Sequence, residues 1–126
     1  MSKQNLYLGK RGEEKAVRLL EDNGYKILLK NYKTKLGEID IIACDKDTIC
    51  FIEVKARYSD RFGLPSEAVL CHKQRQISKA ALTFLKENNL LDKKARFDVV
   101  SVLYSEENPK FDLIKNAFEL DAEFSY

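Results

Sequence analysis

The chain has 126 residues, of which 44% are hydrophobic and 33% are charged, and its formal net charge is +2. This size and composition are typical of one globular domain that buries its own core, and the small net charge does not by itself indicate a nucleic-acid-binding protein. No apolar run is long enough to span a bilayer and no signal-peptide core starts the chain, so we expect a cytoplasmic protein with no membrane partner.

The first predicted element is a helix over residues 12–23, which Gly24 ends. Residues 1–8 are polar with two apolar residues and are expected to be frayed or lightly docked. The apolar stripe of the helix contains Ala16 and Leu20, and Glu13 precedes these residues at helical spacing. Glu13, and not Glu14, is therefore expected on the core-facing side. The alternative is a glutamate in the first helical turn, where the helix dipole favours an acid.

Three strands are expected next, over residues 25–32, 37–42 and 51–55, with a basic turn at residues 33–36. The second and third strands contain β-formers with little strict alternation. This pattern is typical of strands that are buried on both faces, inside a sheet covered by helices.

Charged residues interrupt these two apolar strands, although burying an unpaired charge is unfavourable. Residues i and i+2 share a face of a strand, so Glu38 goes with Asp40, and Glu53 with Lys55. If residues 46–47 form the tip of a two-residue hairpin, Asp40 lies opposite Glu53 and Glu38 lies opposite Lys55, all on one face. A register shifted by one residue would separate the two acid sets.

Two carboxylates in directly opposed positions would be roughly 5 Å apart and would repel each other. A divalent cation between Asp40 and Glu53 would remove this repulsion, because Mg²⁺ takes oxygen ligands at about 2.1 Å. The alternative is a pair of salt bridges at the strand ends. Glu38 would then pair with Lys55, while Asp40 and Glu53 would reach solvent.

Residues 56–66 form a polar loop with Gly and Pro that mixes arginines with aromatic residues. Beside the acids, Arg57, Tyr58 and Arg61 could contact phosphates and stack on bases. An ordinary surface loop would have a similar composition.

A second helix is expected over residues 66–88, with a possible break near residue 70. One turn before the buried position Ile77, Lys73 and Gln74 continue the core-facing side toward the acids. They could contact a phosphate or a metal-bound water, and the alternative is a solvated helix start. A strand at residues 96–104, a turn at 106–109 and an edge strand at 111–118 complete the chain.

This order of elements, α-β-β-β-α-β-β, predicts an α/β fold with a mixed central sheet flanked by helices. We find no repeat and no linker, and therefore expect a single domain over residues 1–126 with a core at about 9–120.

Asp40, a turn, and Glu53 and Lys55 in a Glu-x-Lys pattern resemble the PD-(D/E)xK nuclease superfamily, which has the restriction-endonuclease-like fold. Residues 37–43 (Gly-Glu-Ile-Asp-Ile-Ile-Ala), 51–55 (Phe-Ile-Glu-Val-Lys) and 96–100 (Arg-Phe-Asp-Val-Val) resemble the YraN-like family of small bacterial proteins. That family is related in fold to archaeal-type Holliday junction resolvases. The similarity covers nearly the whole chain, although Ile39 stands where the superfamily name has Pro.

The resemblance implies a metal-dependent endonuclease that cleaves DNA, with branched or flapped structures as candidate substrates and Mg²⁺ or Mn²⁺ as the cofactor. The ligands would be Asp40, Glu53 and Glu13, and the Val54 carbonyl is a further candidate. Lys55 would orient the attacking water and stabilise negative charge, with Glu38 as its outer partner. The match also places a recurrent basic motif at residues 73–75.

Two other classes of function remain open from the sequence. One is a non-catalytic nucleic-acid-binding module on a nuclease-like scaffold, and the other is an interaction protein without a nucleic-acid role. A resolvase-like activity would favour a homodimer, because two strands need two sites.

Overall fold

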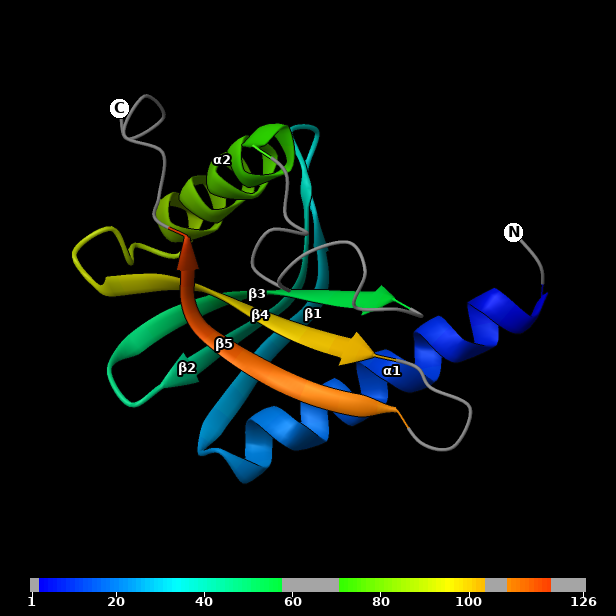
Figure 1. The fold of residues 1–126 in the computed structure, drawn as a ribbon. Helices are drawn as coiled ribbons and strands as arrows, with labels where there is room; N and C mark the ends of the chain where they lie inside the picture. The colour runs from blue at the N-terminus through cyan, green and yellow to red at the C-terminus, as the bar shows by residue number, and fades with distance from the viewer. Residues whose placement is uncertain (1–2, 58–70, 104–108, 119–126) are drawn as a thin grey trace.

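The computed structural model describes residues 3–57, 71–103 and 109–118, and its element order is the predicted α-β-β-β-α-β-β (Figure 1). The two helices are α1 (Lys3–Asp22) and α2 (Cys71–Glu87). The five strands are β1 (Tyr25–Lys33), β2 (Glu38–Asp45), β3 (Thr48–Arg57), β4 (Lys94–Leu103) and β5 (Lys110–Phe118).

The strands form one sheet in the order β1-β2-β3-β4-β5. All neighbours are antiparallel except β3 and β4, which are parallel because the chain returns through α2 between them. The helix α1 covers one face of the sheet and α2 covers the other (Figure 1). The prediction of a mixed sheet flanked by helices is therefore confirmed, and so is the edge position of β5.

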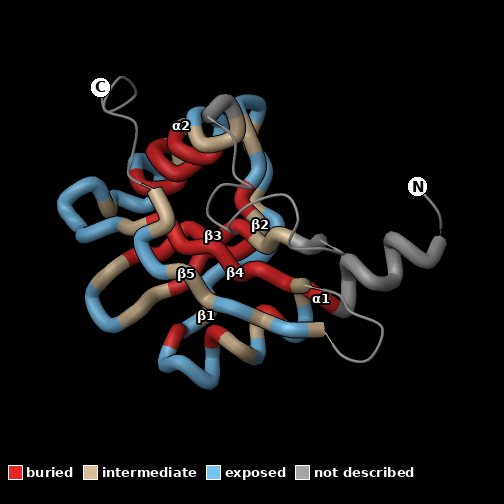
Figure 2. Tube along the Cα trace, viewed as in Figure 1, coloured by how far each residue is buried: buried red, intermediate tan, exposed pale blue. Residues whose placement is uncertain are grey.

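The core has two layers, one on each face of the sheet. The layer under α2 includes Ile77, Ala80 and Phe84 from the helix and Phe51 and Phe97 from the sheet. The layer under α1 joins helix residues to the opposite side chains of the same strands; it contains Ala16, Leu20, Tyr25, Ile41, Ala43, Cys50, Ile52, Val100 and Val102. The central strands, which lie between the two helices, are therefore largely buried (Figure 2). Burial on both faces explains the apolar runs of β2 and β3.

The first helix differs from the prediction at its start. It begins at Lys3 and not near residue 12, so the helix continues through Gly9 and Gly12 although glycine has a low helix propensity. Its end is as expected, since the helix finishes at Asp22 and Gly24 has a φ of 88°. Glu13 therefore lies well inside the helix, and the alternative of a first-turn glutamate is wrong.

The predicted hairpin register is confirmed. The residues on either side of the turn pair as Asp45 with Thr48, and the ladder continues to Ile41 with Ile52. Lys46, in the two-residue tip, has a φ of 58°, as a tight hairpin turn requires. The paired residues end at Ile41 and Ile52, so the predicted pairs of Asp40 with Glu53 and of Glu38 with Lys55 are not part of the ladder. Extended by one position, the same register would set Asp40 across from Glu53.

The alternation of β2 is broken beside Asp40. Ile41 belongs to the layer under α1, whereas Ile39 packs with Ile42 in the layer under α2. Strict alternation would put Ile39 and Ile41 on one face. Across from Asp40 on β1, between paired residues, Asn31 has a φ of 55°. The expectation that Glu38 and Asp40 share a face rests on an alternation that this segment does not have.

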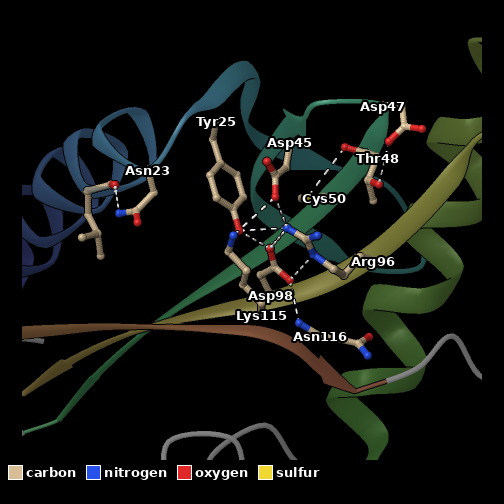
Figure 3. Close-up of polar contacts among 11 residues, drawn as sticks. Asn23, Tyr25, Asp45, Asp47, Thr48, Cys50, Arg96, Asp98, Lys115 and Asn116 are labelled. Carbon is tan, nitrogen blue, oxygen red and sulfur yellow. Dashed lines mark hydrogen bonds and ion pairs between the residues drawn. The ribbon is translucent and has the colours of Figure 1, made fainter.

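A second charged group is buried on the α1 side of the sheet (Figure 3). Asp98 is fully buried, and it accepts hydrogen bonds from the Tyr25 hydroxyl at 2.7 Å and from Arg96 Nε at 2.9 Å. The main-chain nitrogen of Asn116 donates to it at 2.8 Å, and Arg96 also reaches Asp45 at 2.8 Å. This network joins β1, β2, β4 and β5 and satisfies the buried charge without a metal.

Among the described residues, neither helix has the length and apolar character that a membrane crossing would need.

Candidate active site

Asp40 and Glu53 lie side by side at the point where the β2–β3 ladder ends. Glu53 is buried, with 7% of its surface exposed, and Asp40 is half-buried. Asp40 Oδ2 accepts a 2.8 Å hydrogen bond from the main-chain nitrogen of Val54. The alternative in which both acids merely reach solvent is therefore wrong.

Burial and, to a smaller extent, the neighbouring charge of Asp40 raise the pKa of Glu53 to about 7. Burial also raises the pKa of Asp40, against the lowering effect of the Val54 hydrogen bond. Both shifts have the direction expected of like-charged carboxyl groups in a desolvated position, where a retained proton relieves the repulsion. A bound cation would remove the need for this proton.

Lys73 brings a positive charge to the pair from α2. Its Nζ lies 3.6 Å from Glu53 Oε1, and the exposed fractions of the two side chains are 33% and 9%. The charge of Lys73 lowers the pKa of both Glu53 and Asp40. The predicted orientation of Lys73 toward the acids is thus confirmed, and the alternative of a solvated helix start is wrong for this residue.

Glu13 approaches the same group of acids from α1. Its side chain is half-buried while that of Glu14 is exposed, as predicted from the helical spacing. Burial raises the pKa of Glu13, and the charges of Asp40 and Glu38 raise it further. The structure therefore places Glu13 within electrostatic reach of the acids on β2.

Lys55 is half-buried on β3, and its charge lowers the pKa of Glu53. Glu38 is exposed and is paired in the β1–β2 ladder with Lys33. Within the parts of the chain that the structure describes, Glu38 and Lys55 form no ion pair. The predicted contact between these two residues is therefore not present.

The remaining predicted nucleic-acid contacts are mostly outside the described residues. Tyr58 and Arg61 lie in the segment 58–70, and the side chain of Arg57, at the end of β3, is not described. Gln74 is half-buried at the start of α2, next to Lys73, and has an interaction of its own.

A hollow of about 390 Å³ opens beside Glu13 on the α1 side of the sheet. Its lining combines acids, bases and an amide from α1 and β1: Glu13, Glu14, Val17, Arg18, Glu21, Lys30 and Asn31. The hollow therefore gives Glu13 access to solvent.

Comparison with known proteins identifies the family. The model of "Uncharacterised protein family UPF0102" matches residues 12–102, which span both acid-bearing strands and Lys73. This chain belongs to family UPF0102. The match confirms the family part of the resemblance found in the sequence.

Relatives of the same family name match over nearly their whole length. A UPF0102 protein of Geobacter metallireducens is 52% identical over 95% of this chain and 98% of its own. One from Syntrophus aciditrophicus is 53% identical over 93% and 92%, respectively. The chain also aligns with "Crystal structure of SSO0001" at 18% identity and a TM-score of 0.40, over 93% of this chain and 54% of that one.

The described residues of this UPF0102 chain contain no group of three or more His, Cys, Asp or Glu side chains placed to hold a metal ion. Asp40 and Glu53 form a pair, and Glu13 influences it through its charge without completing a set of three. Side chains alone therefore supply two acidic ligands at this point.

Sequence reasoning missed the residues that set the start of β2 in this UPF0102 chain. The Thr34 hydroxyl accepts hydrogen bonds from the main-chain nitrogens of Leu36 and Gly37 and donates one to the Gly37 carbonyl. A Cβ atom on Gly37 would lie 2.6 Å from the main-chain oxygen of Gln76 in α2. The available signal was the Thr-x-x-Gly spacing just before the acidic strand.

Proposed function

We propose that this UPF0102 chain is a metal-dependent nuclease of the PD-(D/E)xK superfamily, with the restriction-endonuclease-like fold, and that it hydrolyses phosphodiester bonds of DNA. The observation that carries the proposal is the buried pair of carboxyl groups, Asp40 and Glu53, on adjacent strands with Lys55 two residues further on. Branched and flapped DNAs are the substrates that we would test first.

The donor set fits a hard divalent cation. Mg²⁺ prefers oxygen ligands and is usually bound through one or two carboxylates, with water and substrate phosphate completing its shell. Asp40 and Glu53 supply two such groups. A cation can replace a proton that the raised pKa values keep on this pair of carboxyl groups. Mg²⁺ or Mn²⁺ is therefore the cofactor we propose.

Each residue then has a defined part. Asp40 and Glu53 would hold the ion, which when bound activates a water molecule and neutralises charge on the phosphate. Glu13 would act from the α1 side, through a water molecule or as a further ligand. Lys55 would orient the water and stabilise negative charge that develops at the phosphate. Lys73, with the basic side chains of residues 57–61, would contact the DNA backbone.

A non-catalytic nucleic-acid-binding module is the second candidate, and one observation favours it. Lys73 Nζ lies 3.6 Å from Glu53 Oε1 and compensates part of its negative charge. A scaffold could retain the acids as such an ion pair. Binding to DNA that decreases with salt and does not depend on divalent cations would support this candidate.

Cleavage of labelled DNAs would test the proposal. Duplex, single-stranded, flap and four-way-junction substrates would be incubated with Mg²⁺, Mn²⁺ or EDTA. The wild type would be compared with Asp40→Asn and Lys55→Ala. Asp92→Asn and Lys86→Ala are matched controls, because both residues are exposed and remote in the sequence from the acids.

Cation-dependent cleavage that is lost in Asp40→Asn and Lys55→Ala, and retained in both controls, would support the nuclease. Equal cleavage by the wild type and Asp40→Asn would point to a contaminating enzyme and would contradict the proposal. If no DNA is cut but all proteins bind it equally, the binding module is the better description. Sedimentation with a junction substrate would test the homodimer that two-strand cleavage favours.

A further inference from the structure

The environment of Lys73 is unusual for a lysine on the surface of a helix. Its side chain is two-thirds covered, and its Nζ is directed at the buried carboxyl group of Glu53, 3.6 Å away. Holding a long side chain in one geometry and desolvating its charge are both unfavourable. The Asp40–Glu53 pair must therefore provide the compensating interaction.

Lys73 is the main positive charge that acts on the Asp40–Glu53 pair. Of the groups in the described residues that shift the pKa of Asp40 most, Lys73 is the cation. Lys73 also lowers the pKa of Glu53 more than Lys55 does. Glu38 adds further negative charge to Asp40. In the absence of a divalent ion, Lys73 is therefore the main counter-charge of both acids.

A divalent ion bound to Glu53 would conflict with the Lys73 ammonium group in its present position. An ion at about 2.1 Å from Glu53 Oε1 would lie within about 6 Å of Lys73 Nζ in its present position. Charges of +2 and +1 at that separation repel strongly in a partly desolvated site. Lys73 can avoid the repulsion by rotating toward solvent, since a third of its side chain is already exposed.

We propose that Lys73 is an internal counter-cation that holds the Asp40–Glu53 pair in the metal-free protein and is displaced when a divalent cation binds. This inference rests on the proposed function for the identity of the site. Displacement turns the ammonium group outward, where it can meet a phosphate oxygen of the substrate. Lys73 would then neutralise the acids in the metal-free site and contact the substrate phosphate in the metal-bound site.

Direct measurement of Mn²⁺ binding tests the displacement without reference to catalysis. Wild type and Lys73→Met would be titrated at about pH 8.5, where the acids are ionised and proton competition is small. Lys94→Met is the matched control, because Lys94 makes a similar ion pair to Asp47 at 3.7 Å, with both side chains about three-quarters exposed. We expect Lys73→Met to bind Mn²⁺ about tenfold more tightly than the wild type, and Lys94→Met to be unchanged.

Thermal unfolding in EDTA tests the counter-cation directly. We expect Lys73→Met to unfold at least about 4 °C below the wild type, and Lys94→Met to be nearly unchanged. Adding Glu53→Gln to Lys73→Met should recover most of the loss, because the neutral amide needs no counter-charge.

Equal or weaker Mn²⁺ binding by Lys73→Met would overturn the displacement, because the lysine would then assist the ion or be irrelevant to it. Equal unfolding temperatures of Lys73→Met and Lys94→Met in EDTA would overturn the counter-cation role. If the wild type binds no Mn²⁺ while Lys73→Met is destabilised in EDTA, the proposed function and the displacement both fail, and a purely structural ion pair is left.

Discussion

Asp40 Oδ2 accepts a hydrogen bond from the main-chain nitrogen of Val54 at the first position beyond the paired residues of β2 and β3. The Asp40 side chain therefore accepts the hydrogen bond of the Val54 nitrogen where the ladder with the main chain of β2 has ended. The same bond fixes the carboxyl group of Asp40 beside that of Glu53. The local structure of the strand and the proposed site thus depend on one interaction.

Asp40→Asn and Asp40→Ala should separate these two roles. Asparagine keeps an oxygen acceptor for the Val54 nitrogen, so we expect little loss of stability. Alanine leaves that nitrogen unsatisfied and should lower the free energy of unfolding by about 1–3 kcal/mol. Divalent-cation binding should be strongly weakened in both variants. Chemical denaturation and Mn²⁺ titration would measure the two effects, with Asp92→Ala as the control. Equal destabilisation by both substitutions would contradict the role of the hydrogen bond.

Glu53 should make the metal-free protein less stable as the pH rises. Its pKa is about 7 in the folded chain and near 4.5 when unfolded, so between these values the folded state binds more protons. The free energy of unfolding should then fall by up to about 3 kcal/mol from pH 4.5 to pH 7 through this group. Urea titrations of wild type and Glu53→Gln in EDTA would measure the difference.

The glutamine variant should lack this part of the pH dependence because it has no proton to lose. Saturating Mg²⁺ should also reduce the decline in the wild type if the ion replaces the proton on Glu53. Parallel pH profiles of wild type and Glu53→Gln in EDTA would show that Glu53 titrates normally, and would contradict the prediction.

The Tyr25–Asp98 contact predicts a contrast between two similar substitutions. Tyr25→Phe removes a hydrogen bond to a fully buried carboxyl group, and should lower the free energy of unfolding by about 1.5–3 kcal/mol. Tyr32→Phe removes an exposed hydrogen bond to Glu87, and should have an effect below about 1 kcal/mol. Denaturant unfolding of both proteins would show whether burial makes the difference, and similar values would argue against it.

Gly37→Ala should disturb the site through the backbone. The new Cβ would meet the Gln76 carbonyl oxygen at 2.6 Å, so β2 and α2 would have to separate. We expect a loss of about 1–3 kcal/mol in stability and weaker cation binding, since Asp40 follows three residues later. Gly24→Asn is a useful comparison: Gly24 has open space and a φ of 88°, which asparagine tolerates. Normal cation binding by Gly37→Ala would refute the link to the site.

Much of the fold could be predicted from the sequence because turns and apolar stripes are local patterns. A two-residue hairpin tip fixes every pair that follows it, so the register from Asp45 to Ile41 could be predicted from one turn. The apolar stripe around Ala16 likewise placed Glu13 toward the sheet. Chain order and turn positions then determined the mixed sheet.

Glu53 is buried within an apolar strand, but it is not the only buried acid among the described residues. Asp98 also interrupts an apolar strand, yet Arg96 and Tyr25 satisfy it. One of these partners is 73 residues away, so no short motif shows which compensation a buried acid has. The broken alternation at Ile39 was equally hidden, because it shows only in the packing of Ile39 and Ile41 into different layers of the core. Only the assembled sheet shows that, among the described residues, Asp98 has hydrogen-bond partners that Glu53 lacks.

The sequence distances within the sheet have a consequence for the order of folding. Asp40 and Val54 are 14 residues apart, whereas Tyr25 and Asp98 are 73 apart. Short loops close at a lower entropic cost, so we expect the β2–β3 hairpin to form early and the parallel pairing of β3 with β4 to form late. The two acids would then meet before α2 delivers Lys73. Their mutual repulsion would act on the folding barrier, and pH or divalent cations would alter the folding rate more than the unfolding rate.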